Sequence, residues 1–439
     1  MITKNMDLTV EIIDLGINGE GIAKHDGAVI FVPFALLGEI VKIHIIYAKS
    51  KFYVGKITEI VKASEHRVTP TCPHFKKCGG CHLQHLSYDE TLKFKTKLVE
   101  NTLTKVGKLN IENLVKPCFA SVPYYYRNKF SFPIGFKDKP FIGMYKENSH
   151  EIVEIENCHI QQPWAKPIID LFNEFICENN ISVYNEQTKQ GLLKHLVCRM
   201  EDNKLLVCVV VNGNSLPNYE QLVSLLSKNF TTFGLMININ KLNNNVILTE
   251  QYKHLYGIKT IKLTNNDLNY EISLNSFMQV NTTIANQIYK RVQDLIKNEV
   301  VVNAFSGAGY LSGLLCKTAK HVYGIEIVAS SHENAETLKR ENNLTNLTNI
   351  LGDVSEKLKT IKDYSFIVLD PPRKGCSKEV IDTILAVKPQ NIIYISCGPA
   401  TLARDLGYLK ESYNINFVEP YDMFPQTHHV ETVVCLSLK

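Results

Sequence analysis

The stretch F-I-V-L-D-P-P-R at residues 366–373, together with Y-I-S-C-G-P-A-T-L at residues 394–402, decides the fold. Each stretch is an apolar, β-branched run that stops at a polar residue followed by proline or glycine. Buried strands of parallel sheets end in this way, at loops that hold ligands in open α/β folds. We therefore predict an α/β fold in which Asp370 and Cys397 lie side by side at the functional edge of one sheet.

The composition is that of an ordinary soluble globular protein. The chain has 439 residues, of which 45% are hydrophobic and 21% charged, and this length predicts two or three domains. No apolar run reaches the roughly 18 residues needed to cross a bilayer, and the polar start, M-I-T-K-N-M-D, has no signal-peptide core. We expect a cytoplasmic monomer without a membrane partner, whose 12 cysteines are metal ligands, catalytic groups or buried residues rather than disulfides. The net charge of +4 permits nucleic-acid binding without arguing for it.

Residues 1–62 form the first predicted domain, a small β-barrel. Short alternating strands are separated by the turn G-I-N-G-E-G-I-A and by A-V-I-F-V-P-F, a pattern that predicts a five-stranded, OB-like barrel. Such barrels bind oligonucleotides or serve as interaction modules, and the pattern leaves both open. Gly19-Glu20-Gly21, Phe31-Val32-Pro33 and Gly38-Glu39 resemble the landmarks of a TRAM domain, an RNA-binding barrel of some RNA-modifying enzymes.

Cys72, Cys78 and Cys81 follow the barrel with the spacing C-x5-C-x2-C. The glycines between the last two cysteines let the backbone fold tightly enough for several thiolates to converge on one centre. A fourth ligand must come from elsewhere, and of Cys118 and Cys158 we favour Cys158. The spacing fits an iron–sulfur cluster and also a zinc site, for which the alternative ligands are His74, His82 and His85.

The segment 124–145 interleaves aromatic residues with basic ones, including Arg127 and Lys129. Such side chains could stack on bases and pair with phosphates, or they could belong to an antiparallel hairpin with a buried aromatic face, and both can hold at once. Strand-like runs and helix-like stretches follow over residues 192–248. We predict an α+β middle domain over residues 63–265 that carries the cysteines and binds RNA.

Strands and helices alternate over residues 266–439, which predicts a doubly wound parallel sheet. A glycine turn, G-x-G-x-x-x-G at 307–313, follows one strand, and Glu326 ends the next, where a carboxylate can accept hydrogen bonds from the ribose hydroxyls of an adenosine. This turn fits NADP-type dehydrogenases nearly as well as S-adenosylmethionine enzymes. The D-P-P-R motif and Cys397 decide between them, because a dehydrogenase needs neither.

Asp370-Pro371-Pro372-Arg373 resembles the D/N-P-P-x motif of methyltransferases that act on nucleobases. The whole chain then resembles the RNA (uracil-5-)-methyltransferases that carry a TRAM domain and an iron–sulfur cluster, the 23S rRNA 5-methyluridine enzymes. The motifs occur in the family's order: the barrel, the cysteine set, F-M-Q-V-N at 277–281, the glycine turn, D-P-P-R, S-C-G-P at 396–399 and H-V-E at 429–431. The resemblance implies S-adenosylmethionine and a 4Fe-4S cluster as cofactors and 23S rRNA as the partner.

The resemblance also implies roles for individual residues. Cys397 would be the nucleophile and Glu431 the general base, with Phe277 near the target base. Cofactor contacts would fall on Gln279, Phe305, Tyr310, Glu326, Asp353 and Asp370, and cluster ligands on Cys72, Cys78, Cys81 and Cys158. The sequence departs from the family at Asn303 and Ser306, where an acid and a cysteine are common, and at Tyr310 and Asp353, where Asn occurs.

The implied chemistry explains why these residue types are needed. C5 of uracil is a poor nucleophile until a thiolate adds to C6; C5 can then attack a sulfonium methyl group, and a base removes the C5 proton. Cys376 is a rival nucleophile by its nearness to D-P-P-R, but its K-G-C-S-K setting predicts an exposed loop. The alternatives are the same chemistry on a tRNA loop, a non-catalytic RNA-binding protein, and an NADP-dependent enzyme with a zinc site.

Overall fold

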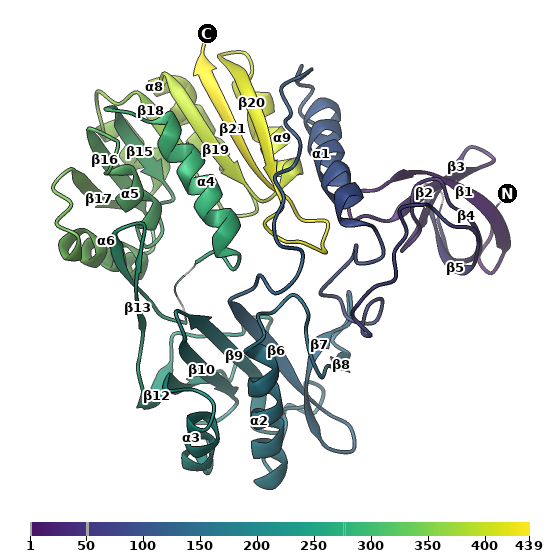
Figure 1. Cartoon of the computed structure of the whole chain (residues 1–439). Helices are drawn as coiled ribbons and strands as arrows, with labels where there is room; N and C mark the ends of the chain where they lie inside the picture. The colour runs from purple at the N-terminus through teal and green to yellow at the C-terminus, as the bar shows by residue number, and fades with distance from the viewer. Residues whose placement is uncertain (1, 50–51, 275, 277) are drawn as a thin grey trace.

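The computed structural model describes residues 2–49, 52–274, 276 and 278–439. It has three parts: a small barrel at the N-terminus, a middle domain, and a C-terminal domain that lies above the middle domain in Figure 1. The mixed α/β fold with an N-terminal barrel, as expected from the sequence, is confirmed. No helix among the described residues has both the length and the apolar character needed to cross a membrane.

The N-terminal barrel closes because its strands turn apolar residues inward at alternate positions. Its strands are β1 (Asp7–Leu15), β2 (Gly21–His25), β3 (Ala28–Val32), β4 (Ile40–Lys49) and β5 (Phe52–Lys62), closed in the order β1-β2-β3-β5-β4. Ile12, Ile30 and Ile43 are fully buried inside. Gly21 occupies a crowded point, since a Cβ atom there would lie 2.8 Å from that of Ala35.

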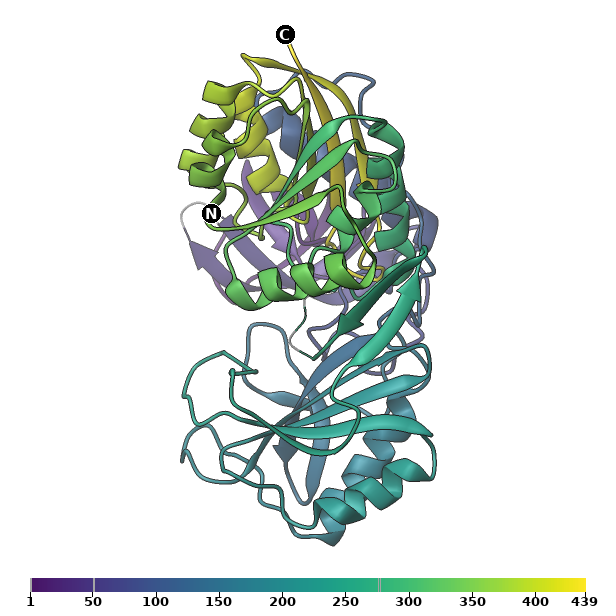
Figure 2. The same cartoon turned by 90° about the vertical axis from the view of Figure 1, so that its left-hand side faces the viewer.

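The middle domain is a seven-stranded sheet with two helices on one face (Figure 2). In sheet order the strands are β12 (Tyr252–Gly257), β11 (Thr232–Ile239), β10 (Lys204–Val211), β9 (Leu193–Glu201), β6 (Lys129–Phe136), β7 (Pro140–Tyr145) and β8 (Ile152–Glu154). The helices are α2 (Ala165–Glu178) and α3 (Tyr219–Ser227). Phe130 and Phe132 stack at 4.3 Å and pack in one core with Phe172 of α2. The predicted antiparallel hairpin with a buried aromatic face is therefore confirmed, as β6 and β7.

The C-terminal sheet also has seven strands, in the order β17-β16-β15-β18-β19-β21-β20. They are β15 (Val300–Ala304), β16 (His321–Glu326), β17 (Leu347–Leu351), β18 (Phe366–Leu369), β19 (Asn391–Ser396), β20 (Tyr413–Tyr421) and β21 (Glu431–Leu438). The predicted parallel sheet needs one correction, because β21 runs antiparallel between β19 and β20. The short connection at residues 422–430 has no room for the crossover helix that a parallel strand would need.

Helices cover both faces of this sheet. The helices are α4 (Thr282–Leu295), α5 (Tyr310–Leu315), α6 (Ala329–Glu341), α7 (Val354–Lys357), α8 (Lys378–Val387) and α9 (Pro399–Leu409), with a 3-10 turn η1 at Leu358–Thr360. Helices α4 and α5 share one apolar core, whereas α8 and α9 share the other. A hairpin of β13 (Ile261–Asn265) and β14 (Leu268–Ile272) packs against both the middle sheet and α5, so the expected boundary after residue 265 runs through one element.

Helix α1 (Tyr88–Lys105) packs on the C-terminal domain, although the predicted boundaries place it in the middle domain. Val99 and Leu103 lie in the same core as Leu402 and Leu406 of α9. In Figure 1 the helix stands beside β20, a strand that comes much later in the chain. The chain therefore reaches the C-terminal domain once early, through α1, and again after the middle domain is complete.

A buried ion pair fastens α1 to the segment that precedes β21. Lys95 and Asp422 are both fully buried and in contact through Nζ and Oδ1. The Tyr88 hydroxyl donates a hydrogen bond to Asp422 Oδ2 at 2.8 Å, and Lys95 Nζ also donates to the carbonyl of Phe424 at 3.1 Å. These bonds position the connection between β20 and β21 from its first residues.

We expect Asp422→Ala to destabilise the protein by about 3–5 kcal/mol, because it leaves the Lys95 ammonium buried without its partner. Chemical denaturation followed by circular dichroism measures this loss. The exposed i,i+4 pair Lys166–Asp170 on α2 is the matched control, and Asp170→Ala should cost less than about 1 kcal/mol. The double change Lys95→Met with Asp422→Leu should recover most of the stability; if it is as unstable as Asp422→Ala, the unpaired charge is not the cause.

Candidate active site

Two neighbouring parallel strands end in the residues that the sequence singled out. Strand β18 pairs with β19 so that Leu369 lies opposite Tyr394. Asp370 is the first residue after β18, and Cys397 is the first after β19. The predicted juxtaposition of these two residues at one sheet edge is confirmed.

The antiparallel strand β21 adds the carboxylate of Glu431 to this edge. Ser396 pairs with Thr432, so the next step in the register sets Cys397 opposite Glu431. The electrostatics agree with this placement: burial raises the pKa of the Cys397 thiol, and the nearby charge of Glu431 raises it further. The structure therefore brings together the predicted nucleophile and the predicted base.

Glu431 is a buried carboxylate with an unused oxygen. The residue is 2% exposed, and its Oε2 atom has no hydrogen-bond partner among the described residues. Burial raises its pKa well above the usual carboxylate value, and the charge of Asp370 adds to the rise, while Arg373 opposes it. A buried polar atom without a partner is costly unless a ligand satisfies it, so Oε2 is suited to accept a proton from a bound molecule.

Arg373 is a site residue that our sequence assignment did not include. Its charge opposes the rise that burial causes in the pKa of both Cys397 and Glu431, which places it near both groups. Its carbonyl accepts a hydrogen bond from the hydroxyl of Thr401 at 3.1 Å, which ties the D-P-P-R turn to α9. The signal was in the sequence, because Arg373 is the last residue of that motif.

The glycine turn and Glu326 form the expected cofactor side of the site. Glu326 Oε2 accepts a hydrogen bond from the Gly307 N–H at 2.8 Å, and its Oε1 accepts one from Val328 N–H at 2.7 Å. Phe305 and Gly307 both have left-handed backbone conformations, with φ of 61° and 55°. Because a Cβ atom at Gly307 would meet nothing within 4 Å, the turn leaves open space in front of it.

Two predicted cofactor contacts already have structural tasks. Tyr310 is 6% exposed, and its ring packs on Tyr270 at 4.7 Å. Asp353 caps α7 by accepting a hydrogen bond from Ser355 N–H at 2.8 Å. Their roles toward the cofactor remain predictions.

Gln279 and Asp370 are the remaining predicted cofactor contacts within the described residues, and their roles toward the cofactor also remain predictions. Gln279 lines a small cavity together with Tyr310. Burial raises the pKa of Asp370 to about 7. Phe277, predicted near the target base, lies outside the described residues.

The predicted cluster ligands meet around one cavity. Cys72, Cys78, Cys81 and Cys158 all line a space of about 240 Å³. Burial raises the pKa of Cys158 to about 11, and the neighbouring thiols of Cys78 and Cys72 contribute to the rise. Among the described residues, no group of three Cys, His, Asp or Glu side chains has the arrangement of a metal site. Burial raises the pKa of Cys81, and the thiols of Cys158, Cys78 and Cys72 all lie close enough to raise it further, so the four are neighbours across this cavity.

The alternative ligands differ in their positions. Cys118 is buried in the core of the C-terminal domain, away from this cavity. The ring of His82 contacts that of His428, and His85 packs beside Phe34. His74 does line the cavity.

The two basic residues predicted to bind RNA have different surroundings. Arg127 lines the cysteine cavity, and it is near enough to the loop before Glu431 that its charge adds to the effect of burial in lowering the pKa of His429. Lys129 Nζ donates a hydrogen bond to the carbonyl of Leu274 at 2.8 Å. Lys129 therefore holds the segment that joins the middle and C-terminal domains, and an RNA contact at this residue remains a prediction.

Cys376 is not on an exposed loop, which corrects one expectation. The residue is 4% exposed, and its sulfur accepts a hydrogen bond from the Tyr394 hydroxyl at 3.5 Å. The residues of the K-G-C-S-K segment are mostly polar, but Asp405 accepts a hydrogen bond from the Cys376 N–H at 2.9 Å and so holds the segment against α9. Burial raises the pKa of this thiol to about 12, so Cys376 is unsuited to act as a nucleophile.

Comparison with known proteins places this geometry in a family. The model described as tRNA (uracil-5-)-methyltransferase matches residues 87–439, and the TRAM domain model matches residues 4–58. The chain belongs to the tRNA (uracil-5-)-methyltransferase family. The resemblance of the barrel to a TRAM domain is thereby confirmed, and membership in this uracil-5-methyltransferase family excludes the NADP-dependent alternative.

Several relatives match the uracil-5-methyltransferase chain over its full length. An uncharacterized RNA methyltransferase of Clostridium acetobutylicum is 38% identical over 450 residues, covering 99% of this chain and 98% of its own. One from Staphylococcus epidermidis is 36% identical, covering 100% and 99%. The crystal structure of Pyrococcus abyssi tRNA (uracil-54, C5)-methyltransferase in complex with S-adenosyl-L-homocysteine matches with a TM-score of 0.81 at 27% identity, covering 98% of this chain and 99% of that one.

Proposed function

We propose that this RNA (uracil-5-)-methyltransferase methylates C5 of a uridine in 23S rRNA, with Cys397 as nucleophile and Glu431 as general base. One observation carries the assignment of the two residues: the β19–β21 register sets a strand-end thiol opposite a buried carboxylate with an unpartnered oxygen. Structural cysteines and surface glutamates are common, but a facing pair at the ligand edge of a methyltransferase sheet has a chemical use.

The side chains divide the reaction between them. The Cys397 thiolate forms a bond to C6 of uracil, which makes C5 electron-rich. S-adenosylmethionine supplies the methyl group that C5 receives. Glu431 Oε2 then accepts the C5 proton, the C5–C6 double bond re-forms, and the bond from C6 to the Cys397 sulfur breaks. The positive charge of Arg373 favours the thiolate, because it opposes the rise in the pKa of Cys397 that burial and Glu431 cause.

The carboxylates at the strand ends, Glu326 and Asp370, would bind the cofactor. Glu326 braces the glycine turn and has lone pairs left for ribose hydroxyls, while Asp370 stands between the cofactor side and Cys397. Asp370 has a pKa of about 7 in the absence of ligand because of its burial. A positively charged sulfonium beside it would lower that pKa and hold the carboxylate ionised.

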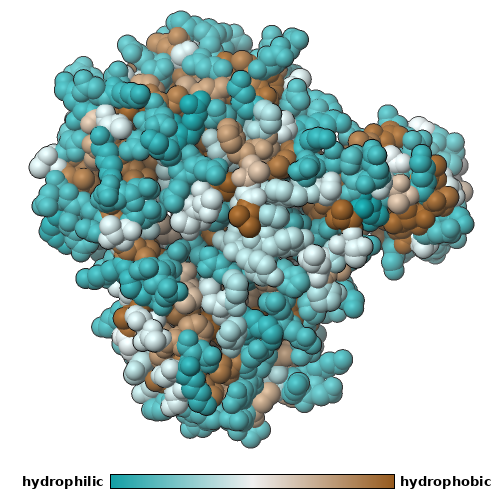
Figure 3. Space-filling view, viewed as in Figure 1, coloured by the Kyte–Doolittle hydropathy of each residue, from teal (hydrophilic) through white to brown (hydrophobic). Residues whose placement is uncertain are grey.

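The barrel surface supports an RNA substrate. Hydrophobic side chains gather over the barrel at the right of Figure 3. On the barrel, Tyr47 and Phe52 are 37% and 38% exposed and stack at 5.6 Å, with Lys49 Nζ 5.5 Å from the Tyr47 ring. Exposed aromatic rings beside a lysine suit bases and phosphates of a single strand. A base must leave its stack to reach Cys397, and such a surface would hold the surrounding RNA.

The four thiols support a 4Fe-4S cluster over a zinc ion, because they line one cavity and their C-x5-C-x2-C spacing lacks the paired C-x2-C units that mark a zinc site. Cys72, Cys78, Cys81 and Cys158 would hold the cluster, which would act as a cross-link between two distant segments. Just beyond Cys81, the N–H groups of His82 and Leu83 donate hydrogen bonds to the carbonyl of Gln426 at 2.9 and 3.0 Å. The cluster would thus support the loop that leads to Glu431.

We expect Cys81→Ser, purified without oxygen, to lose the iron, the acid-labile sulfide and the brown colour of the unchanged protein, and to melt at a lower temperature. The physical reason is the loss of one ligand and of the cross-link. Metal analysis and thermal melting measure both effects. Cys177→Ser changes an exposed cysteine outside the cavity and should change neither quantity. Colourless protein that contains zinc would contradict the cluster.

A tRNA loop is the second candidate substrate, and one observation favours it. The Pyrococcus abyssi enzyme, named for uracil-54 of tRNA, matches 98% of this chain, barrel included. The barrel alone therefore does not select rRNA. Mapping 5-methyluridine in rRNA and tRNA from cells with and without this protein decides: loss of a 23S rRNA site supports the first proposal, and loss only in tRNA replaces it with the second.

A further inference from the structure

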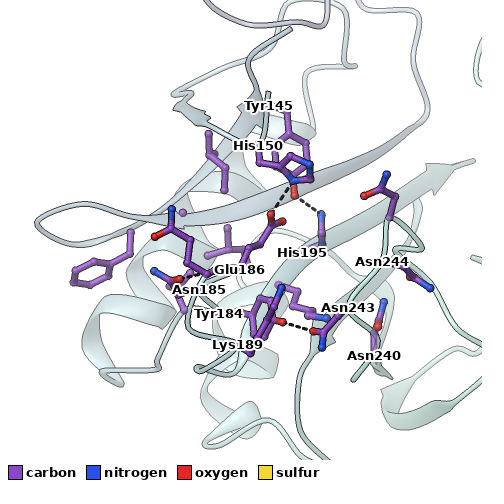
Figure 4. A pocket seen from close by; sticks show the side chains of 18 of the residues that line it. Tyr145, His150, Tyr184, Asn185, Glu186, Lys189, His195, Asn240, Asn243 and Asn244 are labelled. Atoms are coloured by element: carbon purple, nitrogen blue, oxygen red, sulfur yellow. Dashed lines mark hydrogen bonds and ion pairs between the residues drawn. The ribbon is translucent and has the colours of Figure 1, made fainter. Parts of the chain in front are cut away.

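The middle domain carries a large groove that the methylation chemistry does not use. It has a volume of about 730 Å³ and lies where β7, the start of β9, and the loops 183–189 and 240–246 meet (Figure 4). We name it the middle-domain groove and define it by Tyr145, His150, Tyr184, Lys189, His195 and Asn243. Figure 4 shows these side chains around one shared space.

The carboxylates of the middle-domain groove are already paired. Glu186 contacts His150 Nδ1 at 2.7 Å, and Glu151 contacts Lys146 Nζ at 3.1 Å. Lys189 is exposed, and its ammonium has no ion-pair partner within the described part of the chain. The groove therefore presents a lysine ammonium without an ion-pair partner among the described residues, while its two carboxylates already contact side chains of the protein.

Aromatic rings and amide groups line the rest of the middle-domain groove. The Tyr184 hydroxyl donates a hydrogen bond to Asn243 Oδ1 at 2.7 Å, which leaves the Asn243 amide N–H groups for another partner. Lys194 Nζ lies 4.4 Å from the centre of the Tyr184 ring and so holds that ring in place. His195 Nε2 bonds the Tyr145 hydroxyl at 3.2 Å, while its buried Nδ1 atom has no partner among the described residues.

These groups match one kind of ligand. Aromatic rings stack on unpaired bases, amide groups read base edges, and a lysine pairs with the adjoining phosphate. We propose that the middle-domain groove binds an unpaired nucleotide of the RNA substrate, outside the target uridine. This inference rests on the proposed function, since it takes the substrate to be RNA.

The position of the groove relative to the active site supports this role. Side chains alternate along β9, so His195 and Arg199 lie on the same face of the sheet. Arg199 donates a hydrogen bond to the carbonyl of Met278 at 3.5 Å, and Thr282 donates one to Glu201 at 3.4 Å. One strand thus runs from the groove to the segment that carries Gln279. From His195 to Glu201 it spans about 20 Å, a distance that a few unstacked nucleotides can bridge.

The test uses the full-length protein and a fluorescein-labelled oligouridylate, with affinity measured by anisotropy. We expect Tyr184→Ala to weaken binding by roughly 5- to 150-fold, the effect of losing one stacked base. Tyr184→Phe keeps the ring and should bind as the unchanged protein does. Tyr408→Ala, at an exposed tyrosine on α9, is the matched control and should also have no effect. If Tyr184→Ala fails to fold, Lys189→Ala replaces it, with a several-fold loss expected.

Crosslinking separates this inference from the proposed function. Oligouridylate containing 4-thiouridine should crosslink to peptides that contain Tyr145 or Tyr184, even in Cys397→Ala protein that transfers no methyl group. Crosslinks at the groove with no methylated RNA in cells would uphold the groove and overturn the function. Unchanged affinity of both Tyr184→Ala and Lys189→Ala, or crosslinks confined to the barrel and the C-terminal domain, would overturn the groove.

Discussion

Cys397→Ala should abolish methyl transfer while RNA binding survives. Without the thiolate, C5 of uracil stays a poor nucleophile, and the rate should fall by about 10⁴-fold or more, as when a covalent nucleophile is removed elsewhere. Transfer of radioactive methyl from S-adenosylmethionine to RNA measures the rate, and a gel shift measures binding. Cys397 lies in a loop after β19 and fills no core, so the change should leave the fold intact.

Cys376→Ala is the matched control for this experiment. It removes the other thiol near the D-P-P-R turn, but that thiol is buried and accepts a hydrogen bond from the Tyr394 hydroxyl. We expect methyl transfer close to that of the unchanged protein. Retained activity in Cys397→Ala with lost activity in Cys376→Ala would exchange the two roles and refute the register argument.

Local patterns predicted the strand ends because each depends on a few adjacent residues. F-I-V-L before Asp370 and I-I-Y-I-S before Cys397 are buried strands by hydrophobicity alone, and the sheet order then makes them neighbours. The cysteine spacing likewise contained its own signal, and the structure gathers Cys72, Cys78, Cys81 and Cys158 around one cavity.

Contacts between residues that are far apart in the chain could not be predicted from the sequence. Nothing near Lys95 indicates that a lysine in an amphipathic helix will be fully buried, because its partner, Asp422, lies more than three hundred residues later. The polar letters around Cys376 predicted exposure for the same reason, since Asp405 and Tyr394 bury that loop from elsewhere in the chain. Lys129 resembled a phosphate-binding residue, and its observed partner is a carbonyl in an interdomain segment.

The role proposed for Glu431 depends both on a local sequence pattern and on long-range strand pairing. From the sequence, a glutamate in V-E-T-V is a strand residue like many others, and only the resemblance to a family singled it out. The structure adds the physical reason: β21 enters the sheet antiparallel, and its first residue faces the loop after β19. A parallel strand would have carried Glu431 to the opposite edge, away from Cys397.

Glu431→Gln should trap a covalent complex between the protein and its RNA. Cys397 can still add to C6 and the methyl group can still reach C5, but the amide cannot take the C5 proton, so the C6–S bond does not break. We expect a slowly migrating band on a denaturing gel that contains both RNA and protein, and turnover reduced about 10²- to 10⁴-fold. The band should need S-adenosylmethionine to accumulate fully and should vanish when Cys397→Ala is added to the same chain.

The pH dependence supplies an independent check on the same residue. Burial raises the pKa of Glu431 above the usual carboxylate range, with the charge of Asp370 acting in the same direction. The base works only when ionised, so removal of the C5 proton, followed as the release of methylated RNA from the covalent adduct, should be fastest above this raised pKa and slow as the pH drops through it. The acidic limb should therefore lie at a higher pH than an exposed glutamate would give. Replacing Asp370 with Asn removes a neighbouring negative charge and should move that limb to lower pH in single-turnover assays at saturating S-adenosylmethionine. An acidic limb that stays in place, or a Glu431→Gln protein that releases methylated RNA normally, would show that another group removes the proton.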